Sequence, residues 1–416
     1  MIPEDISIKY YTYDLPAERI AMHPLPERDS SKLLVYKDEI ITESTFDKVD
    51  TFLNEKCLLV YNNTQVINAR LIFFKESGKK IEIFCLEPFQ EFADYNMVMT
   101  STSSLRWKCM VGGAASWKGE TLVKNITHKN STINLEARLI EKVQEVFVVE
   151  FSWSHPYTFA EVLAQAGVVP LPPYIKRKPI DADVERYQTI YAAQQGSVAA
   201  PTAGLHFTDA VFKRLDKKKI ARLALTLHVG AGTFKPVTAE TMSNHIMHAE
   251  WIDVNLATIE KLASFEHDIV AVGTTSLRTL ETLYWLGIKA LDNPEIESLT
   301  LLQWDPYKLT EQTIQRKQAL QALISWMKNK AAKKLITTTQ LLIVPGYKFK
   351  MTDVIITNFH QPHSTLLLLV AAAVGERWKE LYRYALENEF RFLSYGDSNL
   401  IFIDQGLMVT DVPTGM

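Results

Sequence analysis

The stretch from residue 66 to residue 153 constrains the fold most, because it contains strand-like runs with no helical pattern between them. These runs are rich in β-branched and aromatic residues and partly alternate apolar with polar positions, as half-buried strands do. Turn residues at 77–79 and 117–119 help to separate them. Five to seven such strands predict a small closed β-barrel. The runs are residues 80–87, 105–111, 120–126, 131–137 and 144–151.

Outside this stretch, strands are followed by loops and helices. A capping-box pattern at 158–161 predicts a helix that ends at Gly167. The alternation predicts a largely parallel or mixed sheet with crossover helices. We therefore expect an α/β main domain made of residues 1–65 and 154–416, with a β-barrel domain of residues 66–153 inserted into it. The expected strands of the main domain include residues 221–229, 268–273, 353–358 and 399–404.

Composition limits the classes of protein that fit. The chain has 416 residues, of which 47% are hydrophobic, and a formal net charge of −3. The acidic balance argues weakly against nonspecific binding of nucleic acid. The N-terminus lacks a secretory pattern, the three cysteines lack metal-ligand spacing, and the apolar run at 366–375 is too short to span a bilayer. We expect a cytoplasmic protein without a membrane partner.

Two uncharged, turn-rich segments, 197–208 and 226–236, contain the first candidate site residues. Glycine lets the backbone approach a ligand closely, and an imidazole titrates near neutral pH. Either segment alone fits an ordinary loop equally well. Their occurrence in tandem, each at the end of an expected element, favours a small-molecule site. The candidates are Thr202, Gly204, His206, His228, Gly230 and Gly232.

Further polar residues cluster at 244–250, where His245 and His248 lie close to Glu250. A metal site is disfavoured because the spacing is not that of a known zinc motif and no third ligand is specified. A polar cluster in which Glu250 orients a histidine or binds a ligand hydroxyl fits better.

The segment 273–278 places free backbone amides at the start of an expected helix, with Arg278 one turn further on. This arrangement suits a carboxylate or a phosphate, although a plain capped helix has the same pattern. The segment lacks the spacing of a nucleoside-triphosphate loop. Neither a dinucleotide-binding fingerprint nor a nucleophile elbow is present elsewhere.

Taken in order, the motifs of this chain resemble the S-adenosylmethionine:tRNA ribosyltransferase-isomerase family of bacterial queuosine synthesis. The resemblance extends over nearly the whole length, so chance is excluded as its origin. It rests on residues 13–16, 24–30, 33–35, 61–71, 170–175, 185–191, 197–208, 226–236, 247–250, 271–281, 345–349, 356–360, 364–367 and 395–397.

The resemblance implies an α/β domain carrying an inserted β-barrel. It also implies transfer of the ribosyl part of S-adenosylmethionine to 7-aminomethyl-7-deazaguanine at the wobble position of tRNA. The products are epoxyqueuosine-tRNA, adenine and methionine. No metal or redox cofactor is implied, because S-adenosylmethionine is a consumed substrate. The expected partners are this substrate and the anticodon stem-loop of tRNA, bound by a monomer.

The sulfonium of this substrate acidifies the neighbouring C5′ protons, so a modest base can remove one, and a general acid assists the departure of adenine. This chemistry assigns proton transfer to His206, His228 and Glu250. The residues expected to bind substrate are Thr202, Gly204, Gly230, Gly232, Thr274, Thr275, Ser276, Arg278, Asn358, His360 and Asp397, and those expected to bind tRNA are Arg70, Lys176 and Arg177.

Three departures from the family pattern bear on the acceptor. Residues 111–118 lack the usual basic stretch, residues 398–399 replace the usual Ala-Met, and residues 286–340 form a longer connection than usual, with a surface-packing helix near 310–334. A paralogue that uses another acceptor and a non-catalytic RNA-binding module are therefore alternatives. The acid–base set favours an enzyme, and a metal-dependent hydrolase fits less well.

Overall fold

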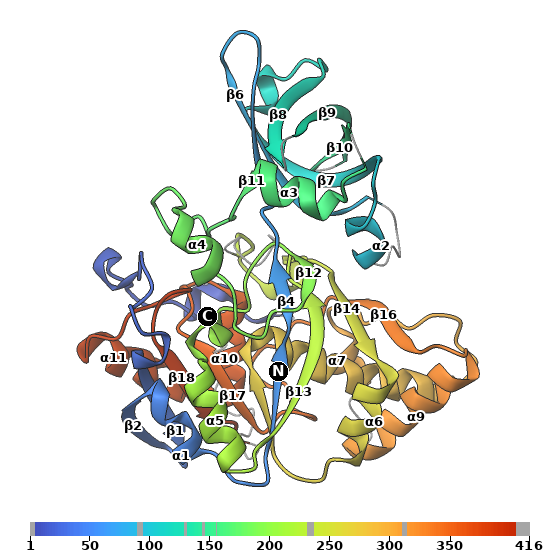
Figure 1. Cartoon of the computed structure of the whole chain (residues 1–416). Coiled ribbons are helices and arrows are strands. Elements are labelled where there is room, and N and C mark those ends of the chain that lie inside the picture. The colour runs from blue at the N-terminus through green and yellow to red at the C-terminus, as the bar shows by residue number, and fades with distance from the viewer. Residues whose placement is uncertain are drawn as a thin grey trace.

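The computed structural model describes residues 5–89, 95–128, 131–143, 146–154, 156–230, 237–309 and 314–404. Most of the chain forms a larger α/β body, and a smaller β-rich body lies above it in Figure 1. Among the described residues, no helix is long and apolar enough to cross a membrane.

The larger body is built on a nine-stranded sheet with the order β16-β14-β13-β3-β15-β17-β18-β1-β2. Strands β13, β3, β15 and β17 run parallel, as do β18 and β1. The other neighbours are antiparallel, so the sheet is mixed rather than largely parallel. The strands are β1 (Lys32–Lys37), β2 (Ile40–Thr45), β3 (Leu58–Asn62), β13 (Ala221–His228), β14 (Glu250–Asn255), β15 (Ile269–Val272), β16 (Lys334–Thr339), β17 (Val354–Asn358) and β18 (Ser398–Phe402).

The central strands are buried on both faces because helices cover each side. Alternate residues point in opposite directions, so that Leu58 and Val60 join one apolar core while Leu59 joins another. The first core includes α6 (Leu256–Ser264), α7 (Gly273–Asp292), α9 (Arg316–Asn329), α10 (Thr365–Val374) and α11 (Trp378–Glu387), and the second includes α1 (Val49–Phe52) and α5 (Asp209–Lys217).

The smaller body is a curled, antiparallel seven-stranded sheet with the order β11-β5-β6-β7-β10-β9-β8. Strand β8 contacts β5, but among the described residues no hydrogen-bonded pairing closes the sheet. The sheet is therefore a half-barrel, where the sequence predicts a closed one. Its strands are β5 (Arg70–Phe74), β6 (Lys80–Pro88), β7 (Ser104–Gly112), β8 (Leu122–His128), β9 (Ser131–Val143), β10 (Val146–Trp153) and β11 (Gly167–Val168).

Helix α3 (Phe159–Ala166) lies against this half-barrel and begins with the expected capping box, in which Thr158 and Glu161 bond each other's backbone amides. Its first residue, Phe159, packs on the rings of Trp107 and Phe151. Helix α3 therefore shares the core of the half-barrel and strand β11 adds to its sheet, although both follow residue 153.

Short elements link the two bodies. A parallel pair joins β4 (Thr64–Val66) to β12 (Gln194–Ser197), and α2 (Tyr95–Met99) and α4 (Asp181–Arg186) lie near the junction (Figure 1).

The stretch from residue 286 to residue 340 is built into the larger body. Its first residues complete α7, α8 (Asp305–Lys308) follows, and β16 extends the nine-stranded sheet. Helix α9 starts at Arg316, with residues 310–313 outside the described part of the chain, and buries Leu320, Leu323 and Met327. The packing stripe is therefore confirmed, while the region also supplies a strand that the sequence did not predict.

Candidate active site

A cavity of about 90 Å³ lies at the ends of strands β15 and β17. The residues that lead into the 3₁₀ turn 202–206 form another part of its wall. Ligands in open α/β sheets bind at such carboxyl ends of strands. The wall is mostly small or uncharged: it includes Ala199, Pro201, Thr202, Gly273, Thr274, Thr275, Thr357, Asn358, His360 and Ser364.

Asn358, the last residue of β17, links this cavity to His206. Its side chain is 3% exposed. Its Nδ2 lies 3.2 Å from Nε2 of His206 and donates to the backbone oxygen of Asp397 at 3.4 Å. Its Oδ1 is buried and has no hydrogen-bond partner among the described residues. Because buried polar atoms are nearly always paired, this oxygen is a candidate acceptor for a ligand proton.

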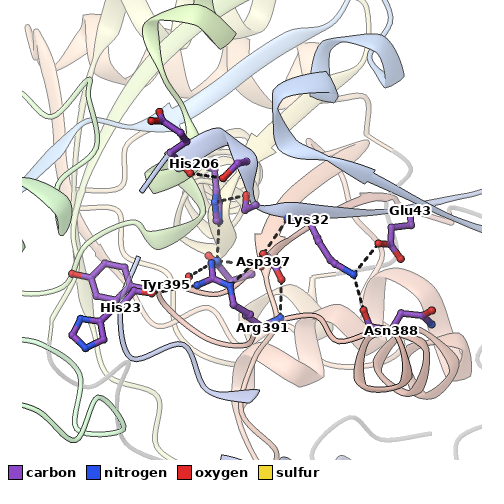
Figure 2. A network of polar contacts seen from close by, with 12 residues as sticks. His23, Lys32, Glu43, His206, Asn388, Arg391, Tyr395 and Asp397 are labelled. Atoms are coloured by element: carbon purple, nitrogen blue, oxygen red, sulfur yellow. Dashed lines mark hydrogen bonds and ion pairs between the residues drawn. The ribbon is translucent and has the colours of Figure 1, made fainter. Parts of the chain in front are cut away.

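His206 is buried, and Figure 2 shows both ring nitrogens in polar contacts. Nδ1 lies 2.9 Å from Oγ of Ser31, and Nε2 accepts from Asn358. Nδ1 therefore carries the proton and donates to Ser31. Burial lowers the pKa of His206 to about 4, and the nearby charges of Arg391 and Arg28 act in the same direction. At neutral pH the imidazole is uncharged.

His360 is the histidine that lines the cavity itself. Its Nε2 lies 2.9 Å from Oγ1 of Thr357, and its backbone groups bond the hydroxyls of Tyr382 and Tyr13. Burial lowers its pKa to about 3, so this imidazole is also neutral at pH 7. The cavity thus contains hydroxyl, amide and imidazole groups but no charged side chain among its described lining residues.

The comparison with known proteins decides the family. A family model described as "Queuosine biosynthesis protein" matches residues 8–401. A protein from Magnetococcus marinus named S-adenosylmethionine:tRNA ribosyltransferase-isomerase is 36% identical over 399 residues, which cover 95% of this chain and 94% of that protein. The chain belongs to the queuosine biosynthesis protein family. The resemblance inferred from the motifs is confirmed.

Two further comparisons concern the length of the chain and a solved structure. A protein of the same name from Anaeromyxobacter sp. (strain Fw109-5) is 37% identical over 399 residues, covering 94% of this chain and 97% of that protein. The matched stretches span nearly all of both chains, so length does not set this family member apart from these relatives. A crystal structure of S-adenosylmethionine tRNA ribosyltransferase from Thermotoga maritima is 26% identical, covers 94% of this chain and 99% of that chain, and has a TM-score of 0.45.

Of the residues that the family's chemistry implies, several lie in the cavity wall and others do not. Thr202, Thr274 and Thr275 line it with Asn358 and His360. Ser276 donates its hydroxyl to the backbone oxygen of Val272 at 2.7 Å, within helix α7. It is therefore engaged in the helix, and the assigned role in substrate binding stays a prediction.

The glycines of the two loops differ in their surroundings. A Cβ at Gly204 would lie 2.0 Å from the hydroxyl of Tyr191, so this glycine permits close packing of the 3₁₀ turn. A Cβ at Gly230 would meet no atom of the described residues within 4 Å. Gly232 lies outside the described residues.

Glu250 and Arg278 form a buried ion pair with each other. Glu250 begins β14, and its Oε2 accepts from Nη1 of Arg278, one turn into α7. Nε of Arg278 donates to the backbone oxygen of Leu341 at 3.0 Å. Neither side chain lines the 90 Å³ cavity. In this structure each charge neutralises the other, so proton transfer by Glu250 and anion binding by Arg278 stay predictions.

His228 and Asp397 also lie outside the described cavity wall. Nδ1 of His228, at the end of β13, is 3.5 Å from Oγ1 of Thr64. The two carboxylate oxygens of Asp397 accept from the backbone amides of Lys32, at 3.0 Å, and Arg391, at 2.7 Å (Figure 2). Burial raises the pKa of Asp397, and these bonds tie the loop before β18 to β1.

The three residues expected to contact tRNA lie in different settings. Arg70, in β5, forms an ion pair with Glu82 at 3.3 Å and stacks over the ring of Phe84. Arg177 is held by Asp183 through two bonds of 2.6 and 2.7 Å. Lys176 is exposed and has no polar partner among the described residues. Of the three, Lys176 is the most accessible to a phosphate.

Sequence reasoning missed a second, smaller cavity beside His206, lined by Arg28, Ser31, Arg186 and Arg391. A signal was present, because Arg28 lies in the run 24–30 and Arg186 in the run 185–191, both of which support the family resemblance. What the sequence lacks is any sign that these runs meet in space.

Proposed function

We propose that this chain is an S-adenosylmethionine:tRNA ribosyltransferase-isomerase. It transfers and isomerises the ribosyl moiety of S-adenosylmethionine onto 7-aminomethyl-7-deazaguanine at the wobble position, giving epoxyqueuosine-tRNA, adenine and methionine. The observation that carries this proposal is the near-complete match to relatives of that name. The family match over residues 8–401 supports it independently.

The cavity offers the groups that this reaction needs. A neutral imidazole can accept a proton, and an amide oxygen without a partner can accept a hydrogen bond from a nucleobase amine. We assign the unpaired Oδ1 of Asn358 to a base edge, and His206 to proton transfer after Asn358 releases its Nε2. His360 and the cavity threonines bind the nucleoside part through hydroxyl and imidazole groups.

The partners follow from the same proposal. The reaction balances with S-adenosylmethionine as a consumed substrate and needs no further cofactor. The acceptor base lies in the single-stranded anticodon loop, where unstacked bases are open to recognition. We propose that a monomer acts on this stem-loop in the cytoplasm, with Lys176 at a tRNA contact.

The test is incubation with S-adenosylmethionine and tRNA that carries 7-aminomethyl-7-deazaguanine, followed by measurement of adenine and methionine release. The same tRNA with guanine at the wobble position is the control substrate. We expect release only with the deazaguanine tRNA. Equal release with guanine, or none with either tRNA, would sink the proposal; release with a different acceptor alone points to a paralogous activity.

A variant pair links the reaction to the cavity. Asn358→Ala removes the bond to His206 and the unpaired acceptor, so we expect kcat/KM to fall about 10- to 100-fold, the loss typical of one polar group in a site. Thr279→Val is the matched control, because Thr279 does not line the cavity and its hydroxyl donates to the Thr275 backbone oxygen, one turn earlier in α7.

A further inference from the structure

The cavity behind His206 is distinct from the 90 Å³ cavity but adjacent to it. It has a volume of about 20 Å³, enough for one water-sized group. Ser394 lines both cavities, and the His206–Asn358 contact joins a residue of one wall to a residue of the other. Whatever occupies the smaller cavity therefore lies next to the proposed reaction site.

Three arginines from separate parts of the chain meet at this cavity: Arg28, Arg186 at the end of α4, and Arg391 before β18. Backbone oxygens hold their guanidinium groups in place. Arg28 donates to Gln188 at 2.7 Å and Glu185 at 2.9 Å, Arg186 to Pro26 at 3.0 Å and Leu25 at 2.5 Å, and Arg391 to Tyr395 at 2.9 Å and His23 at 3.3 Å.

Carboxylates neutralise this cluster only in part, through a long ion pair between Asp397 and Arg391. Among the described residues that line the cavity, none is acidic. Asp397 accepts two backbone amides, and its Oδ1 is 3.8 Å from Nε of Arg391. Asp183 is bonded to Arg177 and to the hydroxyl of Tyr395. The exposed Glu185 acts on Arg28 through its charge, and no ion pair joins them among the described residues.

Gathering these charges has a free-energy cost. Burial and the charge of Arg186 lower the pKa of Arg28, and the charges of Arg28 and Arg391 contribute to the low pKa of His206. Nε of Arg186 is also buried without a hydrogen-bond partner among the described residues. An anion in the cavity would offset the repulsion and satisfy this donor.

We propose that Arg28, Arg186 and Arg391 bind a phosphate oxygen of the RNA substrate, beside the nucleotide that enters the 90 Å³ cavity. This inference rests on the proposed function. Arginine matches phosphate geometry, and the volume accepts one oxygen. S-adenosylmethionine fits less well, because the ammonium beside its carboxylate and its sulfonium give it a net positive charge that three guanidinium groups repel, whereas a phosphodiester is purely anionic.

The test measures the affinity for deazaguanine tRNA from about 50 to 200 mM salt, in the wild type and in Arg28→Gln and Arg186→Gln. Each lost phosphate contact reduces the magnitude of the slope of log affinity against log salt by about 0.7–0.9. The factor by which affinity falls between the two salt concentrations is then about threefold smaller in the variant than in the wild type. Arg377→Gln is the matched control, because Arg377 is exposed, pairs with Glu39 and Glu380, and lines neither cavity.

Two further measurements separate the explanations. Arg186→Lys keeps the charge, so we expect it to retain most of the wild-type salt slope even though it loses the two carbonyl bonds. Binding of S-adenosylmethionine is measured on the same proteins and is expected to stay within about twofold, because the proposed site contacts RNA.

The inference is overturned if both glutamine variants keep the wild-type tRNA affinity and slope. It is also overturned if the glutamine variants lose affinity for S-adenosylmethionine while their affinity for tRNA is unchanged. A third contrary outcome is that Arg186→Lys loses as much tRNA affinity as Arg186→Gln and unfolds at a lower urea concentration than the wild type. Adenine release by the wild type tests the proposed function separately, so a failure of either claim is recognised independently.

Discussion

At the scale of single residues, the burial of His206 sets a pH dependence of folding. Its pKa is about 4 in the folded protein and about 6.5 when solvated. Between these values the unfolded state binds more protons, so stability is fully present above pH 6.5 and falls as the pH drops toward 4. The largest contribution of this one group is roughly 3 kcal/mol.

We therefore expect His206→Gln to weaken the pH dependence of the free energy of unfolding between pH 6.5 and 4, measured by urea titration. His267→Gln is the control, because His267 is exposed and its replacement should leave the wild-type dependence intact. A His206→Gln protein that loses stability with falling pH as steeply as the wild type would contradict the assignment. His360, also buried and neutral, is unchanged in both variants and contributes equally.

At the scale of elements, Gly287 decides how closely α9 packs on α7. A Cβ at this position would lie 2.2 Å from the backbone oxygen of Ala319. Alanine favours a helix over glycine by about 1 kcal/mol, but overpacking costs about 1–3 kcal/mol. We expect Gly287→Ala to lower the free energy of unfolding in urea by up to about 2 kcal/mol. Gln318→Ala, on the exposed face of α9, should change it little; a stabilised Gly287→Ala protein would refute the packing argument.

The elements that sequence patterns predict are those whose signal is local. The apolar runs at 268–273 and 353–358 become β15 and β17, and the capping box at 158–161 begins α3. Strand order is not local. Strand β18 pairs antiparallel with β17 and parallel with β1, and this depends on contacts between segments far apart in the chain. For that reason the sequence leaves open a largely parallel or a mixed sheet, and the structure shows a mixed one.

The residues of the candidate site also differ in how far their positions could be predicted from sequence. Asn358 and His360 follow a strong strand signal, so their place at a strand end could be predicted. The ion pair of Glu250 and Arg278 could not, because β14 and α7 meet only in the folded chain. The arginine cluster was missed for a similar reason, since its members are dispersed in sequence and the net charge of −3 conceals them.

At the scale of the whole molecule, the half-barrel has a hydrophobic core separate from those of the α/β body. Its members include Trp107, Ile133 and Phe151, which are fully buried. Domains with their own cores and few shared contacts unfold as separate cooperative units. Among the described residues that line the cavity proposed to bind S-adenosylmethionine, none belongs to this core.

We therefore expect two calorimetric unfolding transitions. S-adenosylmethionine should raise the midpoint temperature of the α/β body alone. At a concentration 100 times Kd, binding adds about 2.7 kcal/mol, which corresponds to a shift of roughly 4 °C for a body of more than about 300 residues. Ile133→Ala should lower the midpoint temperature of the half-barrel transition, because it leaves a cavity in the half-barrel core that costs about 2–5 kcal/mol. A single transition that moves as a whole with both ligand and variant would show instead that the two cores unfold together, with β4 and β12 coupling them.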